Sequence, residues 1–462
     1  MNNLSKKNKI ILFIVMIAVI LISVLPMGLS PVWNGEIPDH RNQYEKMADA
    51  ILDGHLYLDY DVDQGLLDME NPYDPDARRN LGVHYHFDHA FYKGKYYMYF
   101  GVAPVFLTFI PYKLITGHSL TTYHATQIYV GTFIIGVFAL FYLICKLFYK
   151  DFKFYFYLLC ASIFSLLCVW YAVGAPALYC TAITAGLCLA IWSVYFFVKA
   201  VYDDVSLNKS ILFAFLGSLF GALTFACRPP IGLINILVIP LLITYLKKHK
   251  LNKELFGKLV VAALPYFVIA ALLMMYNYVR FDNPFEFGQT YQLTIADQHN
   301  YGSIFSNIDL GRLFKNVGIY FLEISPPLNH FPYVNYGGIL LNFPILLFPY
   351  IMIFDGNFVK RIKEKKIWPL YLCLLGLPIL IIVVDSLFSP FPLERYRMDV
   401  YYIMVISTFI SICNSDLEFG KNKIYKIAFI ILLILTLVKI VLLFLVPNDY
   451  NFTSYYHWFI ND

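Results

Sequence analysis

Four arginines beside long apolar segments are the first residues whose type and placement could do chemistry. Arg228 precedes a pair of prolines, Arg280 ends an apolar run, and Arg395 and Arg397 lie close together. The forked guanidinium group pairs well with phosphate oxygens. For any single arginine, the alternative is pairing with an acid of the chain itself: Asp282, Glu286, Asp385, Glu394 or Asp399. As a set, the four favour a phosphate or pyrophosphate ligand.

A carboxylate, Asp39, follows the first apolar segment. Behind it, apolar residues recur at the spacing of one helix face: Tyr44, Met47, Ala48, Ile51 and Leu52. We therefore expect an amphipathic helix on the membrane surface, with Asp39 at or just before its start and Gly54 at its end. An aspartate in that position caps the helix and stays ionised near the helix dipole. It can also act as a general base.

Histidines and a further carboxylate gather later in the same loop: His84, His86, Asp88 and His89. In an extended segment alternate residues share a face, so His84, His86 and Asp88 could bind a divalent metal. Their spacing matches no strong zinc pattern. We therefore expect no cofactor, and we interpret these side chains as polar substrate contacts or solvated loop surface.

The segments between these residues are typical of membrane spans. Hydrophobic residues make up 59% of the chain and charged residues only 14%, whereas a soluble domain is about a quarter charged. Residues 10–35 and 154–198 contain no charge at all. Because about 20 helical residues cross a bilayer core, the second stretch must hold two spans. The sequence thus predicts an all-α polytopic membrane protein.

We place about eleven spans and orient them by the rule that short cytoplasmic loops hold the excess of Lys and Arg. They cover 10–29, 122–147, 154–173, 179–199, 210–227, 231–246, 259–279, 338–355, 367–387, 399–415 and 426–447. Most basic residues then lie on the side of the N-terminus, including the clusters at 247–250 and 360–366. We expect a plasma-membrane protein with a cytoplasmic N-terminus and an extracytoplasmic C-terminus.

Two large loops then lie on the extracytoplasmic side, at 30–121 and 280–337. Within the first, Tyr99–Gly117 is apolar enough to suggest a span, but a span there would invert every later loop. Pro104 and Pro111 interrupt a helix at this point, and Lys113 adds a charge. We expect an interfacial or re-entrant helix instead. Residues 1–462 are expected to form one helical bundle with an extracytoplasmic cap.

The chain lacks the common nucleotide-binding and hydrolase motifs. It contains no GxxxxGKS/T, no strand-linked GxGxxG, no GxSxG and no HExxH. The acid-rich first loop argues against nucleic acid as a partner. Chemistry on the extracytoplasmic side must then draw its energy from the substrate, for example from an activated lipid-linked group.

Several short motifs together resemble a known family. Asp39 leads into Gln43-Tyr44 and Met47-Ala48, and the stretch Asn71–Gly117 follows. Three more motifs are Asn71-Pro72-Tyr73-Asp74, Asp282–Gly288 and Glu394-Arg395-Tyr396. In these motifs, and in its overall topology, the chain resembles the GT-C superfamily of membrane glycosyltransferases, broadly glycosyltransferase family 39. Members include protein O-mannosyltransferases and lipid A aminoarabinose transferases, whose first outer loop carries two surface helices.

The resemblance implies sugar transfer from a polyprenyl-phosphate carrier to an acceptor hydroxyl on a cell-envelope glycan, lipid or protein. It implies that Asp39 is the base. The chain carries Asp39-His40 where the family has an acidic pair and lacks the Lys-Pro-Pro or His-Pro-Pro of the second helix, so Glu36 and Asp88 stay open as alternatives. Lys95 would join the four arginines at the donor phosphate, and the lipid tail would lie among the spans. The acceptor side would be lined by Tyr44, Arg78, His86 and Tyr291.

Two other classes stay open. A transporter or flippase of lipid-linked glycans would carry polar groups at mid-membrane and repeated halves. The middles of these spans are nearly bare of charge, and no repeat is visible. A polymerase of lipid-linked glycans would also use outer arginines, but it would tolerate loss of Asp39.

Overall fold

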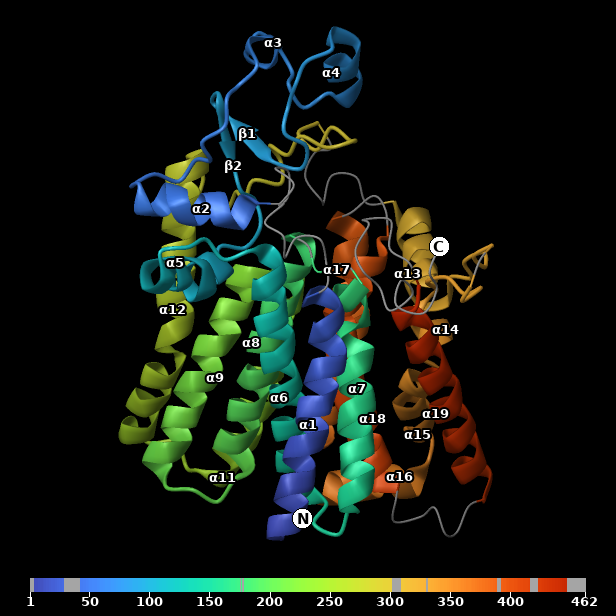
Figure 1. The fold of residues 1–462 in the computed structure, drawn as a ribbon. Coiled ribbons are helices and arrows are strands. Elements are labelled where there is room, and N and C mark those ends of the chain that lie inside the picture. Colours follow the sequence, from blue (N-terminus) through green and yellow to red (C-terminus); the bar gives the residue numbers. More distant parts are fainter. Residues whose placement is uncertain are drawn as a thin grey trace.

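The structure, a computed structural model, describes residues 4–28, 42–174, 176, 178–300, 309–329, 331–388, 392–415 and 423–446. Within this part, ten helices are long and apolar enough to cross a membrane. They pack side by side into one bundle (Figure 1). The chain is therefore a multi-pass α-helical membrane protein, as its composition and uncharged stretches predict.

The spanning helices are α1 (Lys6–Gly28), α6 (Thr122–Phe148), α7 (Phe154–Gly174), α8 (Leu178–Tyr202), α9 (Leu207–Cys227), α10 with η4 and α11 (Pro229–Gly232, Leu233–Leu237, Val238–Lys248), α12 (Lys253–Phe281), α17 (Trp368–Phe388), η6 with α18 (Glu394–Arg397, Met398–Ser415) and α19 (Lys423–Phe444). Helix α18 is the most deeply buried, and α6, α7 and α8 are also largely enclosed. Helices α1, α12 and α19 expose most of their apolar surface, which suits contact with lipid.

The predicted span at 338–355 is wrong as a continuous helix. The structure has three short pieces here, α14 (Ile339–Asn342), η5 (Pro344–Leu347) and α15 (Phe348–Met352), followed by α16 (Gly356–Glu364). Phe343 has φ −135° and ψ 75°, because the residue before a proline avoids the helical region. The break is buried within protein: Phe343, Ile345 and Leu346 are fully enclosed. Irregular backbone in a membrane is tolerated in such a position.

Thr436 of α19 supports this break. Its hydroxyl accepts a hydrogen bond of 3.1 Å from the backbone N–H of Ile345, and the site is buried. Thr436→Val leaves that N–H unsatisfied, so we expect a loss of about 1–3 kcal/mol in the free energy of unfolding. Thermal unfolding of the purified protein in detergent measures the loss. Thr436→Ser keeps the hydroxyl and serves as the control; equal stability of the two variants would contradict this role.

A cap lies at the end of the bundle opposite the N-terminus (Figure 1). Its elements are α2 (Gln43–Leu52), α3 (Gln64–Leu67), α4 (Pro75–Leu81), β1 (Ala90–Tyr92) and β2 (Lys95–Tyr97). Helix α16 and the end of α11, which carry the basic clusters, lie at the N-terminal end instead (Figure 1). Acidic cap and basic loops thus occupy opposite ends of the bundle.

The two large loops are joined within the cap. Strands β1 and β2 pair antiparallel with Phe91 opposite Tyr96, and Lys93 and Gly94 between them both have positive φ, which matches the twist of a tight hairpin. The second loop lies along β1: Phe91 N–H donates to Tyr291 O at 2.8 Å, and Leu293 N–H to His89 O at 2.9 Å. Residues far apart in sequence are thereby held in one layer over the bundle.

The expected surface helices are present, with one correction. Helix α2 buries Tyr44, Met47 and Ala48 as its pattern predicts, but it begins at Gln43 with Asn42 at the N-cap position. The predicted capping role of Asp39 is therefore wrong. In Tyr99–Gly117, the structure has a short helical stretch, η3 (Val105–Phe109) and α5 (Ile110–Thr116), which is well below the length of a span.

Candidate functional site

Among the predicted phosphate-binding arginines, Arg228 is committed to an acid of the chain. It forms a two-pronged pair with Asp399, with Nε to Oδ1 at 2.7 Å and an Nη2 to Oδ2 contact at 2.6 Å. Asp399 is fully buried, and the Arg228 side chain is 18% exposed. The alternative of internal pairing therefore holds for this residue, because a bidentate geometry occupies one edge of the guanidinium.

Arg397 and Arg280 are held inside the protein. Arg397 is 1% exposed and pairs with Glu323. Arg280 donates hydrogen bonds to Met98 O at 2.6 Å and to Asn277 at 2.8 Å. Its guanidinium thus ties α12 to the segment that follows β2. Arg397 links the start of α18 to Glu323 of the second large loop.

Arg395 differs from Arg228 and Arg397, which pair with acids, and from Arg280, whose guanidinium donates hydrogen bonds to two oxygens of the chain. Within the described residues, no acid lies at ion-pair distance from it, and its guanidinium lies against two aromatic rings, 4.0 Å from the centre of Tyr179 and 5.4 Å from that of Tyr396. The Tyr396 ring also lies 5.1 Å from the guanidinium of Arg228. Aromatic faces stabilise a cation without neutralising it. Among the described acids, none neutralises the charge of Arg395.

Asp88 lies one aromatic ring away from Arg395. Its carboxylate accepts hydrogen bonds from the Tyr179 hydroxyl, from the Gln292 amide at 2.5 Å and from the Tyr99 hydroxyl at 3.3 Å. Tyr179 thus contacts the carboxylate with its hydroxyl and the guanidinium with its ring. A carboxylate and a guanidinium thus contact the same tyrosine side chain.

The backbone around Asp88 explains its position. Asp88 has a φ of 61°, a left-handed conformation that Asp tolerates better than most residues. Its N–H donates to Leu293 O at 2.9 Å, and its C=O accepts from Gln43 at 3.0 Å. The second loop and α2 together hold this turn. Tyr179, near the start of α8, meets it from the bundle side.

The predicted convergence of His84, His86 and Asp88 is wrong. The left-handed turn at Asp88 sends its carboxylate toward Tyr179 rather than along an extended strand. His86 stacks on Tyr60 with ring centres 3.9 Å apart. Among the described residues, the group of acids and histidines close enough to share a metal is a different one, Asp53, His55 and Asp59.

Burial raises the pKa of Tyr99 well above its usual value, and the nearby Asp88 carboxylate raises it further while Arg395 opposes it. Desolvation disfavours the charged phenolate, and a neighbouring negative charge does the same. Tyr99 therefore stays a neutral hydroxyl that donates to Asp88.

The other predicted contacts lie elsewhere. Tyr44 is fully buried and donates to Gly101 O at 3.2 Å, and Arg78 donates to two backbone carbonyls at 2.5 Å. Lys95 is exposed on the hairpin, 3.8 Å above the Tyr57 ring. Tyr291 packs among aromatic rings of the cap. Asp39 and Glu36 lie outside the described residues.

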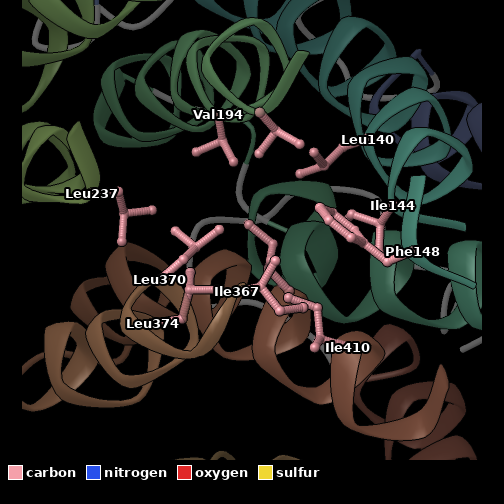
Figure 2. Close-up of a pocket in the computed structure, with 11 residues that line it drawn as sticks. Leu140, Ile144, Phe148, Val194, Leu237, Ile367, Leu370, Leu374 and Ile410 are labelled. Atoms are coloured by element: carbon pink, nitrogen blue, oxygen red, sulfur yellow. The ribbon is translucent and has the colours of Figure 1, made fainter. Parts of the chain in front are cut away.

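Two cavities occur away from this site. The first measures about 20 Å³ and is lined only by apolar side chains, which come from α6, α8, η4, α17 and α18 and from Ile367 just before α17 (Figure 2). That volume is about one water molecule, too small for a sugar. The second, about 230 Å³, lies at the N-terminal end beside Asp203 and Lys248. Neither includes a predicted site residue.

Comparison with known proteins does not assign this chain to a family. No protein-family model, no curated protein and no solved structure matches the chain.

Sequence reasoning missed Tyr179, Tyr99 and Gln292, which surround Asp88. The one available signal was an aromatic residue at the start of a span, which is common at membrane interfaces.

Glu45 of α2 makes the cap sensitive to pH. Its Oε1 accepts the N–H of Thr122 at 2.9 Å, and burial raises its pKa to about 8. The folded state favours the protonated form of Glu45. The contribution of Glu45 to the free energy of unfolding is therefore complete below the unfolded pKa of about 4.5 and is lost as the pH rises to 8. We expect the free energy of unfolding to fall by a few kcal/mol across that pH window. Glu45→Gln, which has no carboxyl group to titrate, should remove most of this fall. An unchanged pH profile in that variant would contradict the assignment.

Proposed function

We propose that this chain is a membrane glycosyltransferase of the GT-C type, which moves a sugar from a polyprenyl-phosphate donor to an acceptor hydroxyl on the extracytoplasmic face. The observation that carries the proposal is the contact of Tyr179 with both Asp88 and Arg395. A carboxylate and a cation that has no ion pair within the described residues thus contact one tyrosine, which supports the proposal. A transferase with a lipid phosphate leaving group needs both.

In this reaction the acceptor hydroxyl loses its proton to a carboxylate while its oxygen attacks the anomeric carbon. The bond between that carbon and the phosphate oxygen breaks, and its electron pair leaves with the lipid phosphate. The placement of Asp88 supports it as the carboxylate, and Asp39 and Glu36 are its competitors. No nucleotide is needed, because the donor bond carries the energy.

Arg395 would stabilise the charge that develops on the leaving phosphate. Its guanidinium is fixed between Tyr179 and Tyr396 before the donor arrives, and preorganised charge is the largest single contribution in many enzymes. Arg228 also lies close to the Tyr396 ring and adds positive potential, although Asp399 offsets much of it. We assign the leading role to Arg395.

The orientation of the protein in the membrane is part of the same proposal. The cap would face the extracytoplasmic side and the basic ends of α11 and α16 the cytoplasm, as the excess of Lys and Arg in short loops favours. The donor lipid would then reach the site from the outer leaflet. Its acceptor would be a cell-envelope glycan, lipid or protein.

Purified protein in liposomes tests the proposal. A polyprenyl-phosphate sugar with a radiolabel in the sugar is supplied with an extract of cell-envelope acceptors. We expect label to move to the acceptor with release of one polyprenyl phosphate for each sugar transferred. Release without an acceptor product, or neither event under conditions in which the protein is folded, would contradict transfer.

A lipid-linked glycan flippase is the second candidate, because the broken segment α14 to α15 is the kind of discontinuous span found in transporters. The same liposomes distinguish the two. A flippase would move labelled donor between leaflets while the bond between sugar and phosphate stays intact. Transfer breaks that bond.

A further inference from the structure

A group of buried polar side chains lies between α13 (Leu310–Leu322), α17 and α18, apart from Asp88. Asn316 and Tyr320 are one turn apart on α13, so they share a face. Helix α13 packs against α17 (Figure 1), whose cap end carries Asp385 and Ser386. All four side chains are at most 5% exposed.

Atoms of these four residues have no hydrogen-bond partner within the described residues: Asp385 Oδ2, Ser386 Oγ, Asn316 Nδ2 and Tyr320 OH. Buried polar groups are nearly always paired, so each unpaired atom calls for an explanation. The helices that carry them pack together, and Asp385 is close enough to Tyr320 to act on it electrostatically, so one explanation for all four is simpler than four separate ones. The Asn316 amide can be turned to present its oxygen instead, since the two orientations are nearly indistinguishable in shape.

The charges around Asp385 are unbalanced. The charged groups that act on it are Asp399 and Arg228, and Arg228 is already engaged by Asp399. An ionised Asp385 would be an uncompensated carboxylate in a low-dielectric setting, which costs several kcal/mol unless a positive charge joins it. Arg395 lies near the Tyr396 ring, as Arg228 does, and forms no ion pair with Asp385.

We propose that Asp385, Ser386, Tyr320 and Asn316 form a binding site for a hard monovalent cation such as Na⁺. All four can offer oxygen, the ligand atom that hard cations select. One positive charge neutralises the group formed by Asp385, Asp399 and Arg228. A proton on Asp385 would also restore neutrality, but it would satisfy one oxygen and leave the hydroxyls of Ser386 and Tyr320 unpaired.

Such a cation would hold α13 of the second large loop against the bundle. It would also keep Asp385 from drawing Arg228 away from Asp399, because the carboxylate charge is then neutralised locally. This inference is independent of the proposed sugar transfer, since it concerns the stability of the α13–α17 contact and not the chemistry at Asp88.

Thermal unfolding of the full-length protein in detergent tests the site. The protein is titrated with NaCl, KCl or MgCl₂ against choline chloride at constant ionic strength and constant pH. We expect the unfolding temperature to rise saturably with NaCl, as for any ligand that binds only the folded state. Asp385→Asn should remove the rise, and Ser386→Ala should raise the half-saturating NaCl concentration about tenfold.

Asp355→Asn is the matched control, because it removes an acid that caps α16 at the other end of the bundle, and it should leave the NaCl response unchanged. If Asp385→Asn fails to fold, Tyr320→Phe and Ser386→Ala carry the test, with binding of radioactive sodium as the second measurement. Equal unfolding temperatures in NaCl and choline chloride would overturn the proposal. So would a dependence on pH alone, which would mean that a proton occupies Asp385.

Discussion

Asp88→Asn is expected to lower the rate of sugar transfer by about 10² to 10⁴ fold, the range that a positioned general base supplies. Asparagine has the same shape but cannot take up the acceptor proton at neutral pH. It can still accept a hydrogen bond from Tyr179 or Gln292 through its one oxygen. Turnover of labelled polyprenyl-phosphate sugar in liposomes measures the effect, and thermal unfolding shows whether the variant stays folded.

Asp76→Asn is the matched control for this loss. Asp76 is an exposed carboxylate on α4 of the same cap, paired only with the equally exposed Arg79, and its replacement should leave turnover unchanged. Asp39→Asn and Glu36→Gln are measured in parallel. Full activity in Asp88→Asn together with loss in Asp39→Asn would transfer the role of base to Asp39.

Arg395→Ala is expected to lower kcat by about 10² to 10³ fold, the cost of removing one preorganised group that stabilises developing charge. The defect should appear in kcat and in kcat/KM for the donor, because the guanidinium would act on the leaving phosphate. Arg395→Lys keeps the charge but loses the fork and much of the stacking on Tyr179, so we expect partial activity. Initial rates with the donor and the acceptor varied in turn separate these effects.

Lys315→Ala, which removes an exposed cation of α13, is the control for Arg395 and should leave both substrates unaffected. A defect confined to the acceptor would contradict phosphate binding by Arg395. Loss of stability equal to that of a core variant would instead assign Arg395 to packing between Tyr179 and Tyr396.

The broken span is a feature that a local sequence pattern cannot predict. Residues 338–355 are apolar along their whole length, so hydropathy alone predicts one helix there. Pro344 and Pro349 allow a break but do not require it, since membrane helices often contain proline. The break is stable because Thr436, far along the chain, hydrogen-bonds the freed N–H of Ile345. That partner is invisible to any pattern confined to the segment.

The arginines show the same limit in the candidate site. The sequence alone supplied the set and the acids that could neutralise its members, including Asp399. Arg228 and Asp399 are 171 positions apart, and only the packing of α9, α10 and α18 brings them together. The same packing leaves Arg395 against aromatic rings rather than an acid. Which arginine keeps a usable charge was therefore a question of tertiary structure.

By itself, the sequence determined that this is a multi-pass membrane protein with a polar cap between apolar spans, because hydrophobic length and helical periodicity are local properties. It also identified Asp88 and Arg395 among several candidates. The tertiary structure decided that both of them contact Tyr179. Contacts of that kind depend on how distant helices and loops pack together, and no spacing along the chain encodes them.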